Sequence, residues 1–147
     1  MDDRALLARA VALAANCPPS DTAFSVGALV VTADGAVLAE GWSRMREPHD
    51  HAEEAALRSL GPGWRAPAGT TVYSSLEPCS ARASRPLTCT ELILAAGVGR
   101  VVFAWREPAL FVDGAGAELL AAAGVEVVEV PELAAAARAP NHHLLHR

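Results

Sequence analysis

Cysteine is scarce in this sequence, which holds three, Cys17, Cys79 and Cys89, among 147 residues. An odd number of cysteines in a chain of this length argues against the disulfide framework with which small secreted domains replace a large core. We therefore expect a cytoplasmic chain, kept in a reducing compartment, whose cysteines are available for other chemistry.

Long apolar runs and clusters of basic residues are also missing. No run approaches the ~18 apolar residues that predict a membrane-spanning helix, and Asp2 and Asp3 at the N-terminus reverse the positive start of a signal peptide. The formal net charge is -5, with 12 basic and 17 acidic side chains, whereas a surface that follows nucleic-acid phosphates needs grouped Lys and Arg. We expect neither a membrane nor a long nucleic acid as a partner.

Apolar residues, by contrast, make up 52% of the chain. That content is enough for a full hydrophobic core, and the length suits one domain, so we expect residues 1–147 to form a single unit. Near-continuous apolar runs over residues 24–32 and 36–42, joined by the turn pair Asp34-Gly35, predict a β-hairpin.

Helices and strands alternate along the rest of the predicted chain. The expected strands cover residues 70–76, 100–105 and 125–130, and the expected helices cover residues 2–16, 51–60, 113–123 and 131–138, with one more helix that ends at Ala96. A hairpin followed by alternating elements predicts a sheet that is partly parallel and covered on both faces. The expected fold is therefore α/β, a three-layer α/β/α sandwich around a five-stranded mixed sheet.

One histidine and two cysteines form a candidate metal-binding set. His51 supplies an imidazole, and Cys79 and Cys89 supply two thiolates, which are ligands of tetrahedral zinc. Three protein ligands leave the fourth position for water, as in catalytic zinc sites, and zinc lowers the pKa of that water to near neutrality. Glu53 follows at the expected helix start and is the carboxylate best placed to take a proton from the water. We expect one zinc ion per chain, with Glu53 as the catalytic residue of a hydrolytic reaction.

Two other interpretations of these residues stay open. His51 could be a core histidine beside two buried free cysteines, because cysteine packs well as a small hydrophobic side chain. The set could also be a structural zinc module, which would need a fourth protein ligand such as Cys17 or His49. For the catalytic interpretation, the positive end of a helix should favour an ionised Glu53, and a strand end should lower the pKa of Cys79.

The order His51-x-Glu53 and then Pro78-Cys79 resembles the zinc-dependent cytidine and deoxycytidylate deaminase superfamily. Three segments look like that family in the same order: Phe-Ser-Val-Gly-Ala-Leu-Val-Val from residue 24, His-Ala-Glu-Glu-Ala-Ala-Leu from residue 51 and Ser-Ser-Leu-Glu-Pro-Cys-Ser from residue 74. The resemblance implies a cytidine-deaminase-like fold, zinc on the histidine and both cysteines, and the glutamate as proton shuttle. It also implies hydrolysis of an exocyclic amine on a small aminated heterocycle, with release of ammonia.

The spacing of the cysteines bears on the substrate. Nine residues separate Cys79 from Cys89, and this spacing is similar to that in the deaminase domain of riboflavin-biosynthesis enzymes, which implies a diaminopyrimidine ribotide. Against that substrate, the usual reductase domain has no room in the chain, Thr-Ala-Phe-Ser before Val26 lacks the Asn-Pro of that family, and Ser43-Arg44 stands near the place of its loop histidine.

Residues 24–28, moreover, look more like nucleoside deaminases, although Trp42-Ser43-Arg44 does not match the Asn-x-Glu ribose-binding element that those enzymes carry after the second strand. We therefore expect cytosine, cytidine or a related nucleoside first and the riboflavin intermediate second. A nucleic-acid-editing deaminase and a non-catalytic zinc module come after these two.

Candidate substrate contacts come from the segments around this set. Open sheets bind ligands beyond the carboxyl ends of their strands, where Trp105 and Phe111 should wall the pocket, with plain edge packing as an equal alternative. Arg82 and Arg85 suit a phosphate through their bidentate forks, although surface solvation explains them equally well. The remaining candidates are Phe24, Ser43, Arg44, Ser75 and His49, the last of which is more often a solvated loop residue.

Two expectations concern the rest of the chain. Glu77 should fix backbone amides near the cysteine loop, and the cluster His142, His143 and His146 belongs to a frayed or docking tail, although such tracts can bind metal. The family resemblance implies a homodimer formed through helices that cover the sheet.

Overall fold

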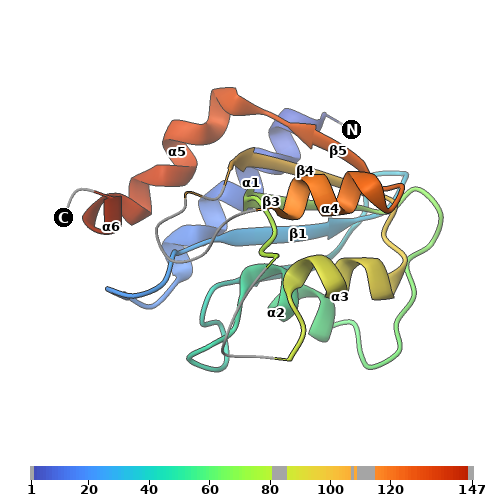
Figure 1. Ribbon diagram of the computed structural model, residues 1–147, viewed down its shortest axis with the longest axis horizontal. Coiled ribbons are helices and arrows are strands. Elements are labelled where there is room, and N and C mark those ends of the chain that lie inside the picture. The colour runs from blue at the N-terminus through green and yellow to red at the C-terminus, as the bar shows by residue number, and fades with distance from the viewer. Residues whose placement is uncertain (1, 81–85, 107, 109–114, 146–147) are drawn as a thin grey trace.

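A five-stranded mixed sheet carries the fold (Figure 1). The computed structural model describes residues 2–80, 86–106, 108 and 115–145. The strands are β1 (Gly27–Val31), β2 (Val37–Trp42), β3 (Thr71–Leu76), β4 (Arg100–Trp105) and β5 (Glu126–Glu129), and their order is β2-β1-β3-β4-β5. β1 runs antiparallel to β2 and β3, whereas β3, β4 and β5 run parallel. The expected mixed sheet of five strands is confirmed.

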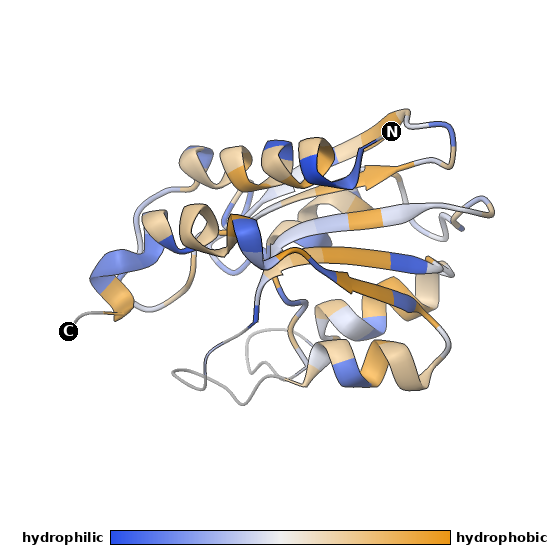
Figure 2. Cartoon of the chain, turned by 90° about the horizontal axis from the view of Figure 1, so that it is seen from above, coloured by the Kyte–Doolittle hydropathy of each residue, from blue (hydrophilic) through white to orange (hydrophobic). Residues whose placement is uncertain are grey.

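Helices cover both faces of this sheet (Figures 1 and 2). One face packs against α1 (Asp3–Leu13) and the segment of α5 (Ala134–Arg138) and α6 (His142–Leu145). The other face packs against α2 (Ala52–Arg58), α3 (Cys89–Ala96) and α4 (Gly116–Ala122). Single helical turns complete the described elements: η1 (Ala14–Asn16), η2 (Pro131–Leu133) and η3 (Ala139–Asn141). The three-layer α/β/α arrangement is confirmed.

The core is divided by the sheet because neighbouring residues of a strand point to opposite faces. In β3, for example, Tyr73 packs in the cluster under α1, while Val72 packs in the cluster under α2, α3 and α4. Val102 and Val101 divide in the same way in β4. Each such buried side chain stabilises the fold by about 1.5–3 kcal/mol. Because the side chains of each strand point alternately to the two faces, they stabilise the packing of both helical layers.

Gly41 brings α2 unusually close to the sheet. A Cβ at this position of β2 would lie 2.2 Å from the carbonyl oxygen of Ala52 and 2.5 Å from the nitrogen of Ala56, so no larger residue fits. The first turn of α2 therefore lies directly on β2. This close packing fixes the helix start, which carries His51 and Glu53, relative to the strand ends.

Two expected elements differ from the structure. Residues 24–26 are not part of β1, because the N–H groups of Ser25 and Val26 donate to the side chains of Asn141 and Ser43 and not to a neighbouring strand. The expected helix over 131–138 starts with the single turn η2 and is followed by two further helical segments that reach Leu145. The tail therefore docks, with Asn141 and Leu144 buried.

Strand pairing brings several strand ends to one rim of the sheet. Gly27 pairs with Trp42, and Leu76 pairs with Trp105, so the start of β1 lies beside the ends of β2, β3 and β4. We call this edge, marked by these four residues, the carboxyl rim. Among the residues that the structure describes, no helix is long and apolar enough to cross a membrane.

Candidate functional site

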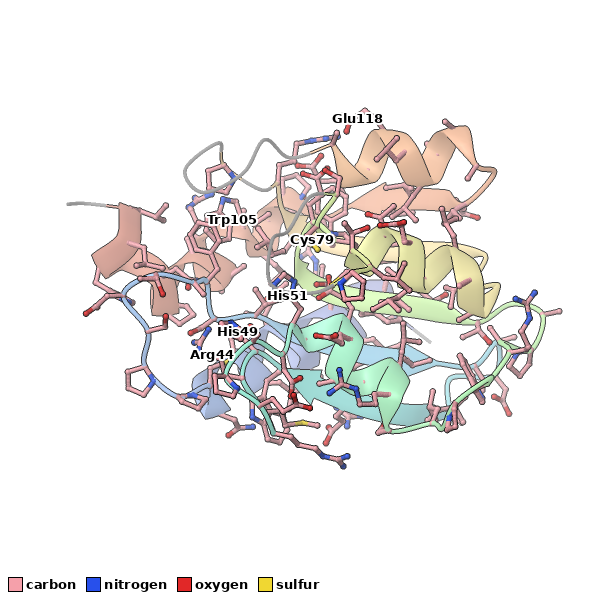
Figure 3. All side chains as sticks on the ribbon, turned by 60° about the horizontal axis from the view of Figure 1, so that its bottom comes forward. Arg44, His49, His51, Cys79, Trp105 and Glu118 are labelled. Atoms are coloured by element: carbon pink, nitrogen blue, oxygen red, sulfur yellow. The ribbon has the colours of Figure 1, made fainter. Side chains whose placement is uncertain are left out.

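Three chain segments converge at the carboxyl rim. His51 is the N-cap of α2, Cys79 lies in the loop after β3, and Cys89 is the first residue of α3. Their ligand atoms all lie within 4.8 Å of one another, and the Sγ of Cys89 is 3.4 Å from the Nδ1 of His51. Figure 3 shows His51 and Cys79 near the middle of this region. The structure thus brings together the three residues that were 28 and 10 positions apart in the sequence.

The spacing of these atoms suits a tetrahedral zinc ion. Zinc bonds of about 2.3 Å to sulfur and about 2.0 Å to nitrogen place two tetrahedral ligands roughly 3.5 Å apart, which matches the 3.4 Å between Cys89 and His51. In the described part of the chain, the group contains these three residues and no fourth histidine, cysteine or carboxylate. The donor set therefore fits one metal ion with a further coordination position.

The surroundings of Cys79 favour its thiolate form, which is the form that binds a metal ion. The backbone N–H of Cys89 donates to the Sγ of Cys79 at 3.2 Å. The hydrogen bond between Cys79 and Cys89, together with the nearby His51, lowers the pKa of the Cys79 thiol to about 4, although burial acts in the opposite direction. The expected lowering of this pKa is confirmed, but a neighbouring thiol and imidazole cause it, and Cys79 lies three residues beyond the end of β3.

Glu53 lies in the first turn of α2 and is only 4% exposed. Burial, together with the nearby negative Cys79, raises the pKa of this carboxyl to about 7. The expected stabilisation of the ionised form by the helix N-terminus is outweighed, because desolvation penalises a buried charge more strongly. The hydroxyl of Ser74 lies 3.2 Å from one Glu53 oxygen and 2.7 Å from the carbonyl of Leu76, so it fixes where the carboxyl sits.

Side chains around Cys79 hold its loop against the neighbouring helices. Glu77 accepts the backbone N–H of Ala117 at 2.8 Å, as expected of a residue that fixes backbone amides, and Thr90 donates to the carbonyl of Cys79 at 2.8 Å. Gly116 has no room for a side chain, because a Cβ would lie 1.9 Å from the carbonyl oxygen of Pro78. The cysteine loop is therefore tied to the starts of both α3 and α4.

Several predicted substrate contacts shape the rim by bonding its backbone. Ser43 accepts the N–H of Val26 at 2.9 Å, and Ser75 accepts the N–H of Gly27 at 3.1 Å. Arg44, whose φ of 59° is unusual for a residue other than glycine, donates to the carbonyl of Pro18, the carbonyl of Phe24 and the hydroxyl of Ser25, at distances of 2.7–3.1 Å. The described contacts of these three side chains thus fix the segment before β1 and the first residue of β1.

The aromatic candidates meet at the same rim. Phe24 and Trp105 pack edge to face with ring centroids 5.2 Å apart, and both are nearly buried. His49 is exposed on the loop before α2, and Figure 3 shows it between Arg44 and His51. Arg82, Arg85 and Phe111 lie outside the described residues.

Some residues that the structure places around the site carry no signal in the sequence. Asp50, 2% exposed, precedes His51 and accepts two backbone N–H groups of its own loop. Those bonds and Arg58 lower the pKa of Asp50 although its burial, the largest single influence, raises it. Asn141, fully buried, accepts the N–H of Ser25 at 2.6 Å and donates to its carbonyl at 3.0 Å. Neither belongs to a repeating pattern or a metal-ligand spacing, so only the three-dimensional packing reveals them.

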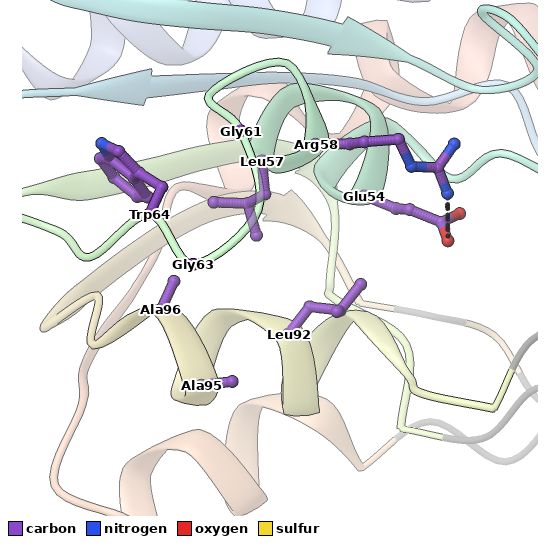
Figure 4. A pocket seen from close by; sticks show the side chains of 9 residues that line it. All are labelled: Glu54, Leu57, Arg58, Gly61, Gly63, Trp64, Leu92, Ala95 and Ala96. Carbon is purple, nitrogen blue, oxygen red and sulfur yellow. Dashed lines mark hydrogen bonds and ion pairs between the residues drawn. The ribbon is translucent and has the colours of Figure 1, made fainter.

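A groove between α2 and α3 is separate from this site (Figure 4). Its volume is about 310 Å³, and apolar residues such as Leu57, Trp64 and Leu92 line it, with Arg58 and Glu54 at one end. None of the three candidate metal ligands lines the groove. The candidate metal site therefore lies outside this groove, at the carboxyl rim.

An α/β/α sandwich that gathers one imidazole and two thiolates beside a buried glutamate is a protein of the zinc hydrolase class. The sequence pattern of the cytidine and deoxycytidylate deaminase zinc-binding region matches residues 1–105. The chain belongs to this family. Zinc is therefore confirmed as the cofactor, because the family is zinc-binding and His51, Cys79 and Cys89 form a group that could hold the ion.

The relatives of this chain are deaminases. It is 40% identical over 118 residues to a diaminohydroxyphosphoribosylamino-pyrimidine deaminase of Schizosaccharomyces pombe, a match that covers 79% of this chain and 29% of that protein. It is 37% identical over 128 residues to the riboflavin biosynthesis protein RibD of Escherichia coli, covering 86% of this chain and 33% of that one. The chain thus spans about a third of the length of these curated relatives.

A solved structure agrees with the sequence matches. The crystal structure of a diaminohydroxyphosphoribosylaminopyrimidine deaminase/5-amino-6-(5-phosphoribosylamino)uracil reductase from Thermotoga maritima matches with a TM-score of 0.76 at 31% identity. The match covers 97% of this chain and 40% of that one. The resemblance to the deaminase superfamily, and to its riboflavin-biosynthesis branch in cysteine spacing, is confirmed.

Proposed function

We propose that this chain is a zinc-dependent hydrolytic deaminase whose substrate is the diaminopyrimidine ribotide of riboflavin biosynthesis. The observation that supports this most is the convergence of His51, Cys79 and Cys89 beside a buried Glu53, in a chain 40% identical to a deaminase named for that substrate. The named relatives favour this substrate over cytosine or cytidine, which we expected first from the sequence. The spacing of the two cysteines supports the same choice.

In this proposal His51, Cys79 and Cys89 hold the zinc ion. The ion would supply a bound water with a pKa near neutrality, a nucleophile at ordinary pH. Glu53 transfers protons. Its pKa of about 7 in the metal-free protein lets this single carboxyl accept and return a proton near neutral pH. A bound dication would lower this pKa, which favours the accepting form at the start of the reaction.

Glu53 serves as base and then as acid. It takes one proton from the attacking water and passes it to the ring nitrogen beside the amine-bearing carbon, then takes the second proton of that water and gives it to the departing amino group, so that ammonia leaves and a carbonyl remains. The hydroxyl of Ser74, 3.2 Å away, can donate to the ionised carboxylate and accept from the protonated acid. The carboxyl thus keeps one hydrogen-bond partner in both protonation states.

In this proposal some residues of the carboxyl rim fix the backbone of the pocket, and others face the heterocycle. Ser43, Arg44 and Ser75 shape the pocket by fixing the backbone before β1 and at its first residue, since their described bonds go to that backbone. The segment of residues 74–79 offers backbone groups to the heterocycle, and Trp105 with Phe24 forms an aromatic wall beside it. His49 stands at the mouth, and Arg82, Arg85 and Phe111 remain candidate contacts.

An ammonia-release assay with the purified, zinc-loaded chain tests the function. The substrates to compare are the diaminopyrimidine ribotide, cytosine, cytidine, deoxycytidine and their phosphates. We expect turnover of the ribotide at least tenfold more efficient than that of any cytosine compound, since a site built to bond polar groups discriminates strongly against substrates that lack them. Turnover of cytidine without turnover of the ribotide would reverse the substrate choice, and absence of bound zinc would remove the mechanism.

A further inference from the structure

Arg58 connects two buried carboxylates on either side of His51. From the last turn of α2 its guanidinium reaches back along the helix, with Nη1 3.0 Å from an oxygen of Asp50 and Nη2 3.1 Å from an oxygen of Glu54. Figure 4 shows the pair with Glu54. Asp50 and Glu54 are 2% and 7% exposed, while the Arg58 side chain is 40% exposed. We call these three residues the Arg58 bracket.

One end of the bracket organises the loop before His51. The second carboxylate oxygen of Asp50 accepts the backbone N–H groups of Arg46 and Glu47 at 3.0 and 2.9 Å. The backbone carbonyl of Asp50 accepts the N–H of Arg44 at 2.8 Å. Asp50 therefore holds residues 44–50 in a closed turn, and the peptide that leads into His51 starts from this fixed point.

The other end of the bracket holds His51 itself. An oxygen of Glu54 accepts the backbone N–H of His51 at 3.2 Å, and the same carboxylate meets Arg58 through its other oxygen. His51 is thus restrained through the residue before it and through its own N–H. Its imidazole must keep Nδ1 within reach of the Cys89 sulfur, now 3.4 Å away, if both are to bind one ion.

We propose that Arg58 is a positioning residue that aims His51 at the metal and so sets the zinc affinity of the site. This inference rests on the ligand set proposed above. Without the guanidinium, Asp50 and Glu54 would be two buried carboxylates lacking their shared positive partner, and their repulsion would pull the loop and the helix start apart. Partners that orient metal ligands in this way change metal affinity by roughly 10- to 100-fold when they are lost.

The positive charge of Arg58, considered alone, predicts the opposite change in zinc affinity. A guanidinium near the site repels Zn²⁺, so removing it should strengthen zinc binding if Arg58 acted only through its field. A positioning role predicts weaker binding after the same change. The direction of the affinity change therefore separates the two explanations.

The test measures zinc affinity of the purified chain by competition with a chromophoric chelator. Arg58→Met, which keeps much of the apolar stem of the side chain, should weaken zinc binding by roughly tenfold or more. Arg9→Met is the matched control, since Arg9 forms an exposed ion pair with Glu40 at 3.2 Å on α1, on the other face of the sheet, and its zinc affinity should equal that of the wild type. Unchanged or tighter binding by a folded Arg58→Met would overturn the proposal.

A second variant covers the case in which Arg58→Met does not fold. Arg58→Lys keeps the charge but lacks the planar fork that meets both carboxylates, so we expect an intermediate loss of affinity. The visible spectrum of the cobalt-substituted variant should also differ from that of the cobalt-substituted wild type, because the imidazole is displaced. Wild-type affinity together with a wild-type spectrum would contradict the positioning role, whereas a wild-type chain that binds no zinc would overturn the proposed function as well.

Discussion

Burial sets the protonation of Glu53, the residue on which the proposed chemistry depends. A carboxyl at a helix start is ordinarily favoured in its ionised form, yet the loss of solvent around Glu53 raises its pKa to about 7. The same side chain lies two positions from His51 and bonds with Ser74. In the metal-free protein this carboxyl can therefore take up and release a proton near neutral pH, and a bound dication would favour the ionised form that accepts one.

Glu53→Gln should abolish most turnover while leaving the metal in place. The amide has the size of the carboxyl but cannot accept a proton, so we expect kcat to fall by roughly 10²- to 10⁴-fold. The assay is ammonia release from the best substrate of the screen, with zinc content measured on the same sample.

Glu40→Gln is the control for this change, because Glu40 is an exposed residue of β2 paired with Arg9. It should keep wild-type activity. Near-normal turnover by Glu53→Gln would show that another group moves the proton.

The metal-ligand residues could be predicted from the sequence because their chemistry is local to the residue type. Histidine and cysteine at this spacing, with a glutamate two positions on, define a donor set without knowledge of the fold, and the structure brings His51, Cys79 and Cys89 together. The pKa of Glu53 could not be predicted in the same way, because it depends on how much solvent the folded chain removes. The Arg58 bracket also escaped prediction, since nothing in the spacing of Asp50, Glu54 and Arg58 distinguishes it from surface charges.

At the scale of elements, the C-terminal segment is part of the wall of the carboxyl rim. Asn141 bonds both backbone groups of Ser25, and Leu144 is buried in the cluster under α1. Residues 24–26 are therefore held by a segment more than 100 positions away in the sequence. Apolar alternation predicts where strands run, but it carries no information about a side chain that replaces a strand as backbone partner.

Asn141→Ala should loosen this wall and destabilise the fold. The change leaves the buried N–H and carbonyl of Ser25 without their described partner, and we expect the free energy of unfolding to fall by about 1–3 kcal/mol. Urea denaturation followed by circular dichroism measures it.

The matched control is Asn16→Ala in η1, where the asparagine is exposed, and it should change stability by less than about 0.5 kcal/mol. Equal stability of the two variants would mean that the Asn141 bonds contribute little.

At the scale of the whole molecule, metal binding and folding should be coupled. His51, Cys79 and Cys89 come from three separate segments, so the unfolded chain offers no comparable site. At a free zinc concentration about 1,000 times the dissociation constant, the ion stabilises the folded state by about 4 kcal/mol. Chelation should then lower Tm by roughly 8–16 °C for a chain of this size.

Thermal unfolding with and without a chelator measures this shift. In the variant Cys89→Ser the difference between the two conditions should shrink to a small fraction of the wild-type value, because one ligand is lost. A chelator-insensitive wild type would contradict the coupling. The expected homodimer, single domain and cytoplasmic location stay predictions.

Acid should weaken an ion-pair cluster at the rim opposite the site. Arg100, at the start of β4, meets both oxygens of Asp3 at 2.8 and 2.6 Å, and this contact lowers the pKa of Asp3 from 3.8 to about 2. Because the folded-state pKa is the lower one, the stabilisation is present above about pH 5 and is lost as the pH falls through 3.8 toward 2.

Asp3→Asn should therefore flatten the dependence of unfolding free energy on pH between about pH 5 and 2. The difference from the wild type should be about 1 kcal/mol, a value kept small because the pair is partly exposed. Denaturation curves at successive pH values measure it, and parallel pH profiles for the two proteins would contradict the assignment to Asp3.

The mixed sheet separates anchoring from reactivity in space. Arg100 at the start of β4 and Glu126 at the start of β5 form an ion-pair cluster with Asp3 at one end of the sheet, while the residues proposed to bind the heterocycle lie at the other end. Substitutions that raise thermal stability can therefore be made at the ion-pair end of the sheet without changing the catalytic rate. Substitutions that alter substrate preference belong at the opposite end.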